Sequence, residues 1–190
     1  MIIYVTKQTF DRYKLKMPEC LTPPMDKLAQ TVIEKEGGDT LCEWGGKLFY
    51  FDHRKCIQIV NFASKFTLFL VDVKINDLPN IGEYIAEYLL DIYATDREMK
   101  KALEHMFKEH PALCFSKLTN KSIISTLNMT QRSFAEDGYR LYDFISDGIL
   151  HTKKINYTVN FNWLFTMKQN GKTDYYYAGK KFREMVVAKY

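Results

Sequence analysis

The sequence predicts a single α+β domain in which an antiparallel β-meander packs against several α-helices, followed by a basic C-terminal extension. One observation is a block of three short apolar segments within residues 47–73, separated by connections of two or three residues. Another is a set of amphipathic segments at residues 80–93 and 96–109. The third is composition, because 190 residues that are 46% hydrophobic can bury roughly two-thirds of their unfolded surface.

The meander is predicted from the spacing of its strands. Connections this short join antiparallel neighbours, because a parallel pair needs a longer crossover. The third segment is almost wholly apolar, which favours a strand covered on both faces. A short first strand is also expected near the N-terminus, where β-branched and aromatic residues cluster. The expected strands are Ile2–Thr6, Lys47–Asp52, Lys55–Phe62 and Phe66–Val73.

The helices are predicted from apolar residues at helical spacing and from residues that begin or end helices. Pro24 suits a first helical turn, and Gly37-Gly38 suits a helix end. Between Tyr84 and Ile92 the apolar residues form one stripe wide enough to pack on a sheet. The expected helices span residues 24–35, 80–93, 96–109, 130–146 and 179–188, with a helical turn at 6–13. Residues 156–165 are expected to be strand or irregular, with a turn at Asn170-Gly171.

The last third of the chain is basic, and we expect a core domain at residues 1–150 followed by a basic, aromatic-rich extension at residues 151–190 that docks on the core. Residues 56–110 carry six Lys/Arg against nine Asp/Glu, a net charge of −3, whereas residues 111–190 carry twelve against six, a net charge of +6. This asymmetry is the main electrostatic indication in the sequence.

The cysteines and the N-terminus favour a cytoplasmic protein. The four cysteines form no CxxC pair and lie at no zinc-like spacing from a histidine. The N-terminus lacks a secretory signal pattern, and no apolar run is long enough for a membrane span. We therefore expect no membrane association, no cofactor and no metal site, while the oligomeric state stays open.

Three places in the sequence carry a resemblance to a known family. They are the opening Ile2–Lys7, the centre formed by Leu41–Trp44 and Asp52–Asn61, and the later Thr119–Ser122 with Thr126–Met129. Over residues 1–150 the chain resembles DUF6933, an uncharacterised domain-of-unknown-function family of small bacterial and phage-associated proteins. Lys121 stands where the family pattern is expected to have arginine. The resemblance implies a bacterial or phage setting and no specific activity.

The tetrapeptide Asp52-His53-Arg54-Lys55 holds the densest set of chemically active side chains. A histidine beside cations can act as general acid or base while Arg54 and Lys55 hold a phosphate, as a metal-independent ribonuclease requires. Neighbouring strand residues point to opposite faces, so a solvated hairpin turn is the competing interpretation. His53, Arg54 and Lys55 are the candidate catalytic residues.

Two further residues are candidates for a small-molecule pocket. Trp44 can line such a pocket or cover the core. Asn128 belongs to a group of neutral polar residues that can bind a ligand or cap a helix.

The basic extension combines cations with aromatic rings, the combination that binds single-stranded nucleic acid or RNA. A lysine-rich solvated surface around core tyrosines is the competing interpretation. The candidate binding residues are Lys153, Lys154, Trp163, Tyr176, Lys180, Lys181 and Arg183.

No GxGxxG, GxxxxGK[ST], GxSxG or HExxH pattern occurs in the chain. The function we expect is therefore a non-catalytic binding or regulatory protein acting on a protein or nucleic-acid partner, such as an inhibitor in host–phage conflict. A ribonuclease using His53 and a small-molecule-binding domain are the alternatives.

Overall fold

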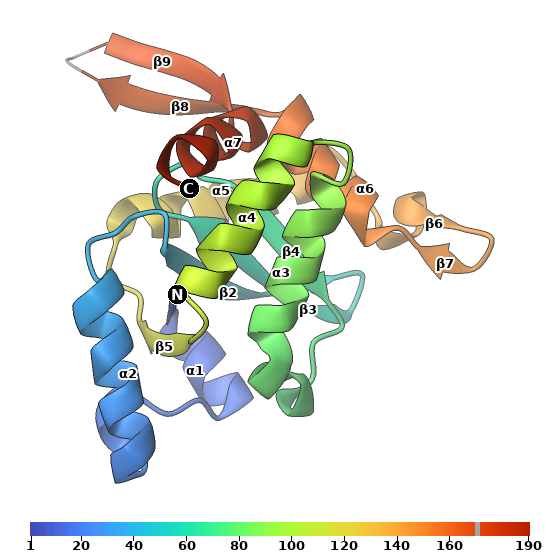
Figure 1. Ribbon diagram of the computed structural model, residues 1–190. Coiled ribbons are helices and arrows are strands. Elements are labelled where there is room, and N and C mark those ends of the chain that lie inside the picture. Colours follow the sequence, from blue (N-terminus) through green and yellow to red (C-terminus); the bar gives the residue numbers. More distant parts are fainter. Residues whose placement is uncertain (170–171) are drawn as a thin grey trace.

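A mixed five-stranded sheet lies at the centre of the computed structural model, which describes residues 1–169 and 172–190 (Figure 1). The strand order is β4-β3-β2-β1-β5, with β1 parallel to both β2 and β5 and the other pairs antiparallel. The strands are β1 (Ile2–Val5), β2 (Glu43–Phe51), β3 (Arg54–Asn61), β4 (Thr67–Val71) and β5 (Cys114–Lys117). The α+β class and the meander β2-β3-β4 are confirmed. The expected turn at Asn170-Gly171 lies outside the described residues.

The β2-β3 hairpin turns through two residues, Asp52 and His53, whose φ angles are 44° and 66°. Two consecutive positive φ angles match the twist that favoured two-residue hairpins require. Asp is among the residues that tolerate this conformation best, and His is also enriched there. The local sequence therefore suits a tight turn at this end of the sheet.

One face of the sheet carries the largest apolar cluster. The helices α1 (Lys7–Tyr13), α3 (Ile81–Ile92), α4 (Arg97–Glu109) and α7 (Ala178–Lys189) contribute residues to it. Sheet residues such as Trp44, Ile59 and Leu68 lie under these helices and are fully buried. Figure 1 shows α3 and α4 crossing in front of the sheet while α7 lies above it.

The opposite face is covered by α2 (Pro23–Glu36) near β1 and β5, and by α5 (Lys121–Glu136) over β2 and β3. Gly45 permits the close approach of α5, because a Cβ placed there would lie 2.1 Å from Cγ2 of Ile123. An aromatic cluster around Phe51, Phe69 and Phe134 continues this layer toward the C-terminal half of the chain.

The expected helix at residues 130–146 is wrong in its bounds, because α5 runs from Lys121 to Glu136. Asn120 caps its start, since the side-chain oxygen accepts a hydrogen bond of 3.1 Å from the amide of Ile123. Gly138, at a φ of 72°, turns the chain just beyond the other end. Leu141 and Phe144 then lie in the short 3₁₀ helix η3 (Leu141–Phe144), which precedes the strands β6 (Ile145–Ser146) and β7 (Ile149–Leu150).

The edge of the sheet at β4 is covered by asparagine side chains and by no further strand. Asn160 accepts from the amide of Thr67 at 2.8 Å and donates to its carbonyl at 2.6 Å. Asn156 makes the same pair of bonds with Phe69, at 2.7 and 3.4 Å. Both residues lie on α6 (Thr152–Tyr157) and the π-helical turn η4 (Thr158–Asn162). The expectation of strand or irregular structure at residues 156–165 is therefore wrong up to Asn162, where the chain is helical, and β8 begins at Leu164.

The C-terminal residues continue into the hairpin β8 (Leu164–Gln169) and β9 (Lys172–Tyr177) and then into α7. Phe182 and Val186 of α7 are fully buried in the main apolar cluster. The Phe182 ring lies 5.7 Å from that of Trp44 and 4.8 Å from that of Phe66. The last helix is thus part of the central core.

Candidate anion-binding surface

The connections after β1 and β5 place a crevice at one end of the sheet. These neighbouring strands run parallel, so their carboxyl ends meet at the same edge. Helix α1, which follows β1, packs on the face that carries α3 and α4, whereas α5, which follows β5, packs on the other face. Open sheets bind ligands where consecutive connections leave toward opposite faces, because the backbone opens there.

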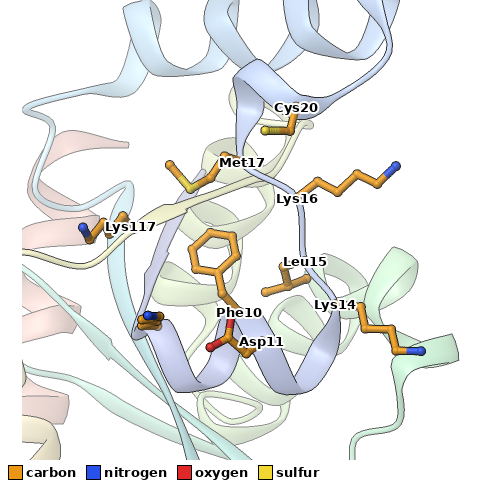
Figure 2. A pocket seen from close by; sticks show the side chains of 9 residues that line it. Phe10, Asp11, Lys14, Leu15, Lys16, Met17, Cys20 and Lys117 are labelled. Carbon is orange, nitrogen blue, oxygen red and sulfur yellow. The ribbon is translucent and has the colours of Figure 1, made fainter.

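A hollow of about 680 Å³ occupies this position. Four lysines line it: Lys7 and Lys14 from α1 and its end, Lys16 from the following loop, and Lys117 from the end of β5. Figure 2 shows the Phe10 ring between these cations, with the loop that carries Leu15 and Met17 beside it. The hollow therefore has a partly apolar wall and a cationic rim.

A second hollow, of about 660 Å³, adjoins the first, because Lys14 lines both. It is formed by the end of α1, the β2-β3 turn and the segment after β4. Its cations are Arg12, Lys14, Arg54, Lys55 and Lys74, with His53 among them.

The two hollows form one basic surface, which we call the α1 face. It comprises Lys7, Arg12, Lys14, Lys16, His53, Arg54, Lys55, Lys74 and Lys117. Within the described part of the chain, the one ion pair on this face joins Arg54 to Asp72 at 3.6 Å, and both side chains are exposed. An exposed pair at that distance is worth little, so these cations stay available to an external anion. Apart from Asp72, Asp11 is the only acid that lines the two hollows.

A third hollow, of about 380 Å³, adjoins the first and is mainly apolar. It lies between α2, the loop at residues 14–16 and the 3₁₀ helix η2 (Ile75–Asn80). Met25, Leu28 and Ile75 line it and are each roughly half exposed. Lys14 and Lys16 therefore border an apolar groove as well as a cationic one.

Comparison with known proteins identifies a family for this chain. The sequence profile described as "Domain of unknown function (DUF6933)" matches residues 2–181. The chain belongs to the DUF6933 family. The match extends past residue 150, so it includes most of the C-terminal extension as well as the residues that carry the resemblance. No curated protein matches the chain, and no solved structure does.

Among the described residues of this DUF6933 protein, no helix has the length and apolar character to span a membrane.

The structure brings the candidate catalytic residues together but separates them from their neighbouring acid. His53, Arg54 and Lys55 all line the second hollow. Asp52 instead accepts hydrogen bonds from the guanidinium of Arg140, at 3.2 Å, and from the amide of Leu141. His53 is therefore not paired with a carboxylate, and it is the one histidine lining this hollow.

The candidate small-molecule residues of the DUF6933 protein do not meet. Trp44 is fully buried under α7 and lines none of the hollows described above. Asn128 is exposed on α5, where its side-chain oxygen accepts a hydrogen bond of 2.7 Å from Lys47. Trp44 serves the core, and Asn128 holds a lysine at the surface.

Several cations of the extension are engaged within the molecule. Arg183 bonds to Asp96 and, at 2.7 Å, to Glu98, while Lys153 pairs with Asp91 at 2.9 Å. Lys180 lies over the Tyr177 ring at 5.0 Å. Lys154 and Lys181 have no ion pair among the described residues. The basic tail thus contacts Asp91 of the acidic α3 and the acids Asp96 and Glu98 at the start of α4.

The two candidate aromatic residues of the extension are partly buried. Trp163 packs against Phe134, with ring centroids 5.0 Å apart, and Tyr176 lies 6.3 Å from Phe165. Burial raises the pKa of Tyr176 to about 12, so its hydroxyl stays protonated. These rings therefore offer less free surface for bases than the sequence suggests.

Sequence reasoning missed most of the α1 face. The signal was present in residues 7–16, where four cations accompany one acid, Asp11. Lys74 and Lys117 carried no such local signal, since they join the surface through the fold.

Proposed function

We propose that this DUF6933 protein is a non-catalytic binding protein whose α1 face holds the phosphate backbone of single-stranded nucleic acid, RNA in particular. The observation that carries the proposal is the convergence of nine basic side chains from four separate segments on two adjoining hollows, with one weak internal ion pair among them. Lysine and arginine bind phosphates mainly by electrostatic attraction and counterion release, which requires unpaired cations.

An exposed ring accompanies these cations. Tyr50 is 49% exposed and pairs across the hairpin with Lys55. A base can stack on such a ring while a neighbouring cation holds the phosphate. The α1 face therefore supplies both kinds of contact, whereas Trp163 and Tyr176 of the C-terminal extension are partly packed.

The arrangement around His53 favours binding over cleavage. Cutting RNA without a metal requires one group to accept a proton and another to donate one. His53 is the single histidine lining its hollow, and the adjacent carboxylate of Asp52 is bonded elsewhere. A His53→Ala variant that bound RNA normally and produced the same intact product as the unaltered protein would agree with this. Cleavage by the unaltered protein that the variant lost would favour the ribonuclease.

The experiment that tests binding is fluorescence anisotropy with a labelled single-stranded RNA and a labelled DNA duplex, at low and moderate salt. We expect RNA binding that weakens with salt, with a slope of roughly −0.7 per phosphate contacted. Reversing Lys14, Lys16 and Lys117 to glutamate should weaken binding by about tenfold or more and flatten the slope by roughly 2.

A matched control makes this test specific to the α1 face. Lys101→Glu, Lys108→Glu and Lys121→Glu change the net charge equally at exposed positions of α4 and α5. Equal loss of affinity in the two triple variants would show diffuse attraction and contradict the proposal. Absence of binding by the unaltered protein at low salt would overturn it.

A second partner class is favoured by the apolar groove beside the α1 face. An acidic amphipathic helix of a protein would place apolar residues against Met25 and Leu28 and carboxylates against Lys14 and Lys16. Selection from a displayed library of helical peptides tests this, with Leu28→Glu as the counter-selection. Enriched peptides should carry acidic residues beside an apolar stripe; failure to enrich any against the unaltered protein would reject this partner class.

The proposed setting is the cytoplasm of bacteria, including cells infected by phage. All four cysteines are free thiols, which suits a reducing compartment. An inhibitory or accessory role in host–phage conflict is the biological context that the family resemblance implies.

A further inference from the structure

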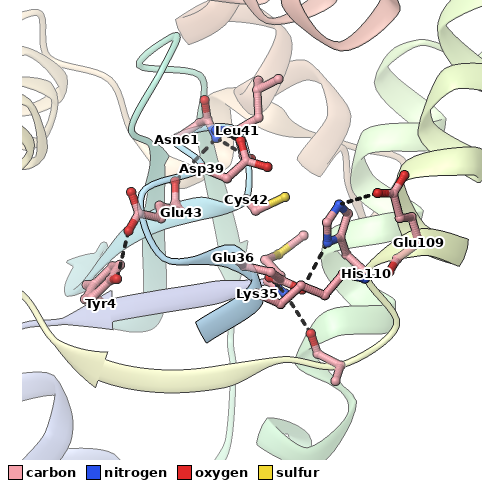
Figure 3. Close-up of polar contacts among 12 residues, drawn as sticks. Tyr4, Lys35, Glu36, Asp39, Leu41, Cys42, Glu43, Asn61, Glu109 and His110 are labelled. Carbon is pink, nitrogen blue, oxygen red and sulfur yellow. Dashed lines mark hydrogen bonds and ion pairs between the residues drawn. The ribbon is translucent and has the colours of Figure 1, made fainter. Parts of the chain in front are cut away.

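A second polar cluster lies away from the α1 face, where the ends of three helices meet. Glu36 is the last residue of α2, His110 follows α4, and Tyr190 follows α7. Cys42 lies in the loop just before β2. Figure 3 shows Glu36, Cys42 and His110 directed toward one another from these separate segments.

The donor atoms of this cluster are close enough to share one ion. One atom each from Glu36, Cys42 and His110 lies within 4.8 Å of the other two. The Tyr190 hydroxyl is 2.9 Å from Nε2 of His110 and 3.6 Å from Sγ of Cys42. Nδ1 of His110 is 3.0 Å from a Glu36 oxygen. A metal-binding histidine usually makes a hydrogen bond through the nitrogen that faces away from the metal, and here Tyr190 supplies that bond at Nε2 while Nδ1 faces Glu36.

The polar side chains of this cluster are almost fully buried. The side chains of Glu36 and His110 are 3% and 6% exposed. The second Glu36 oxygen, Oε2, forms an ion pair with the amino group of Met1. Burial raises the pKa of the Cys42 thiol to about 12, so without a cation this thiol remains protonated. A carboxylate, an imidazole and a thiol, three kinds of side chain that bind transition metals, are thus buried together.

We propose that Glu36, Cys42 and Nδ1 of His110 bind a Zn²⁺ ion, with a water molecule in the fourth position and the Tyr190 hydroxyl holding the ring through Nε2. Zinc accepts this mixture of oxygen, nitrogen and sulfur, whereas magnesium and calcium prefer oxygen alone. Zinc–donor bonds of about 2.0–2.3 Å place tetrahedral donors roughly 3.3–3.8 Å apart, so the 4.8 Å limit requires an inward shift of about 1 Å.

The charges of the proposed site balance. On binding, the S–H bond of Cys42 breaks, its proton passes to water and an S–Zn bond forms, with no change of oxidation state. The thiolate and the Glu36 carboxylate together offset the two positive charges of zinc. The ion and these two ligands would carry no net charge, as a low-dielectric site requires. The Met1 amino group, which pairs with Glu36 in the absence of metal, would keep its hydrogen bond of 2.7 Å to the Ala112 carbonyl.

The site would connect the two ends of the fold. Glu36, Cys42 and His110 lie inside the span matched by the family profile, and Tyr190 lies beyond it. We therefore expect the zinc to cross-link α2, α4 and the start of β2, with α7 closing the site.

The first test titrates the unaltered protein, freed of metal, with Co²⁺ and records its absorption spectrum. Tetrahedral coordination by a thiolate should give a sulfur-to-cobalt charge-transfer band that saturates at one equivalent and disappears when Zn²⁺ is added. Absence of that band would overturn the proposal without requiring any variant to fold.

Variants then assign the ligands. Cys42→Ser should abolish the charge-transfer band and lower zinc affinity by about 100-fold or more, and His110→Gln should lower affinity comparably. The matched control is Cys20→Ser, at the exposed cysteine, which should keep both the band and the affinity. A band that survives Cys42→Ser and is lost with Cys20→Ser would place the metal on the surface and contradict the proposal. Circular dichroism shows whether each variant is folded before its spectrum is interpreted.

Discussion

At the scale of single residues, Arg183 shows how the basic tail is held. Its guanidinium bonds to Asp96, which also caps α4 by accepting a hydrogen bond from Met99. The Arg183 hydrogen bond lowers the pKa of Asp96 below its usual value. The same ionised carboxylate therefore serves a helix cap and an ion pair between α4 and α7.

Replacing Arg183 with glutamine should lower stability in a pH-dependent way. Because the folded-state pKa of Asp96 is depressed, its contribution is complete above the unfolded value of about 3.9 and is lost as pH falls through the folded pKa. For a partly exposed pair we expect a loss of about 0.5–1 kcal/mol at pH 7. Urea denaturation across the acid range measures it. The difference in free energy of unfolding between the variant and the unaltered protein should become smaller in acid. A difference that does not change with pH would indicate lost packing instead. Lys180→Gln, on the same helix, is the control.

At the scale of elements, the edge of the sheet at β4 is closed by helical side chains. An unpaired edge strand offers free amides and carbonyls to other chains, and natural proteins cover such edges. Here the amides of Asn160 and Asn156, four residues apart, meet Thr67 and Phe69, two residues apart on β4. The spacing works because one helical turn and two strand residues cover similar distances, about 6 Å and 6.7 Å.

Removing one of these side chains should destabilise the fold strongly. Asn160→Ala leaves the buried amide and carbonyl of Thr67 without partners, at a cost of roughly 1–3 kcal/mol for each group. We expect a total loss of about 2–4 kcal/mol in chemical denaturation. Asn162→Ala, at an exposed position of the same π-helical turn, should change stability little. Similar losses in the two variants would show that Asn160 acts through the helix and not through β4.

These asparagines also show where sequence reasoning stops. The meander was predictable because short connections and apolar alternation are local signals. The pairing of β1 with β5 joins residues more than a hundred positions apart, and nothing local encodes it. Residues 156–162 lack a clear apolar period because two of their inward positions are the asparagines that bind β4. The cations of residues 7–16 could be recognised in the sequence because they are close together along the chain. Their proximity to Lys74 and Lys117 arises only from the fold.

At the scale of the whole molecule, the C-terminal residues pack against the rest of the chain. Lys153 and Arg183 of the basic tail pair with Asp91 of α3 and with two acids at the start of α4, so part of the opposite charge of these regions is used inside the molecule. The cations of the α1 face lack comparable partners among the described residues. A net charge of +4 therefore understates how strongly one face can attract an anion.

Phe182 offers a test of whether the last helix is packed into the core. Its ring contacts Trp44 and Phe66 at the centre of the core, and it is fully buried. Phe182→Ala should therefore cost about 3–5 kcal/mol, the range for truncating a buried aromatic residue. Urea denaturation followed by tryptophan fluorescence measures this, and Lys180→Ala, exposed on the same helix, is the control.

A single cooperative transition at lower urea is the result expected if α7 folds with the sheet. Two transitions, with the second at the urea concentration of the unaltered protein, would instead show that residues 1–150 fold without the extension. A loss below about 1 kcal/mol would mean that the cavity collapses and that the contacts of Phe182 contribute little. Because Trp44 lies directly against Phe182, its emission should shift toward longer wavelengths as water reaches the indole, reporting on this contact separately from global unfolding. Placing Phe182→Ala in a Trp163→Phe background assigns that shift to Trp44.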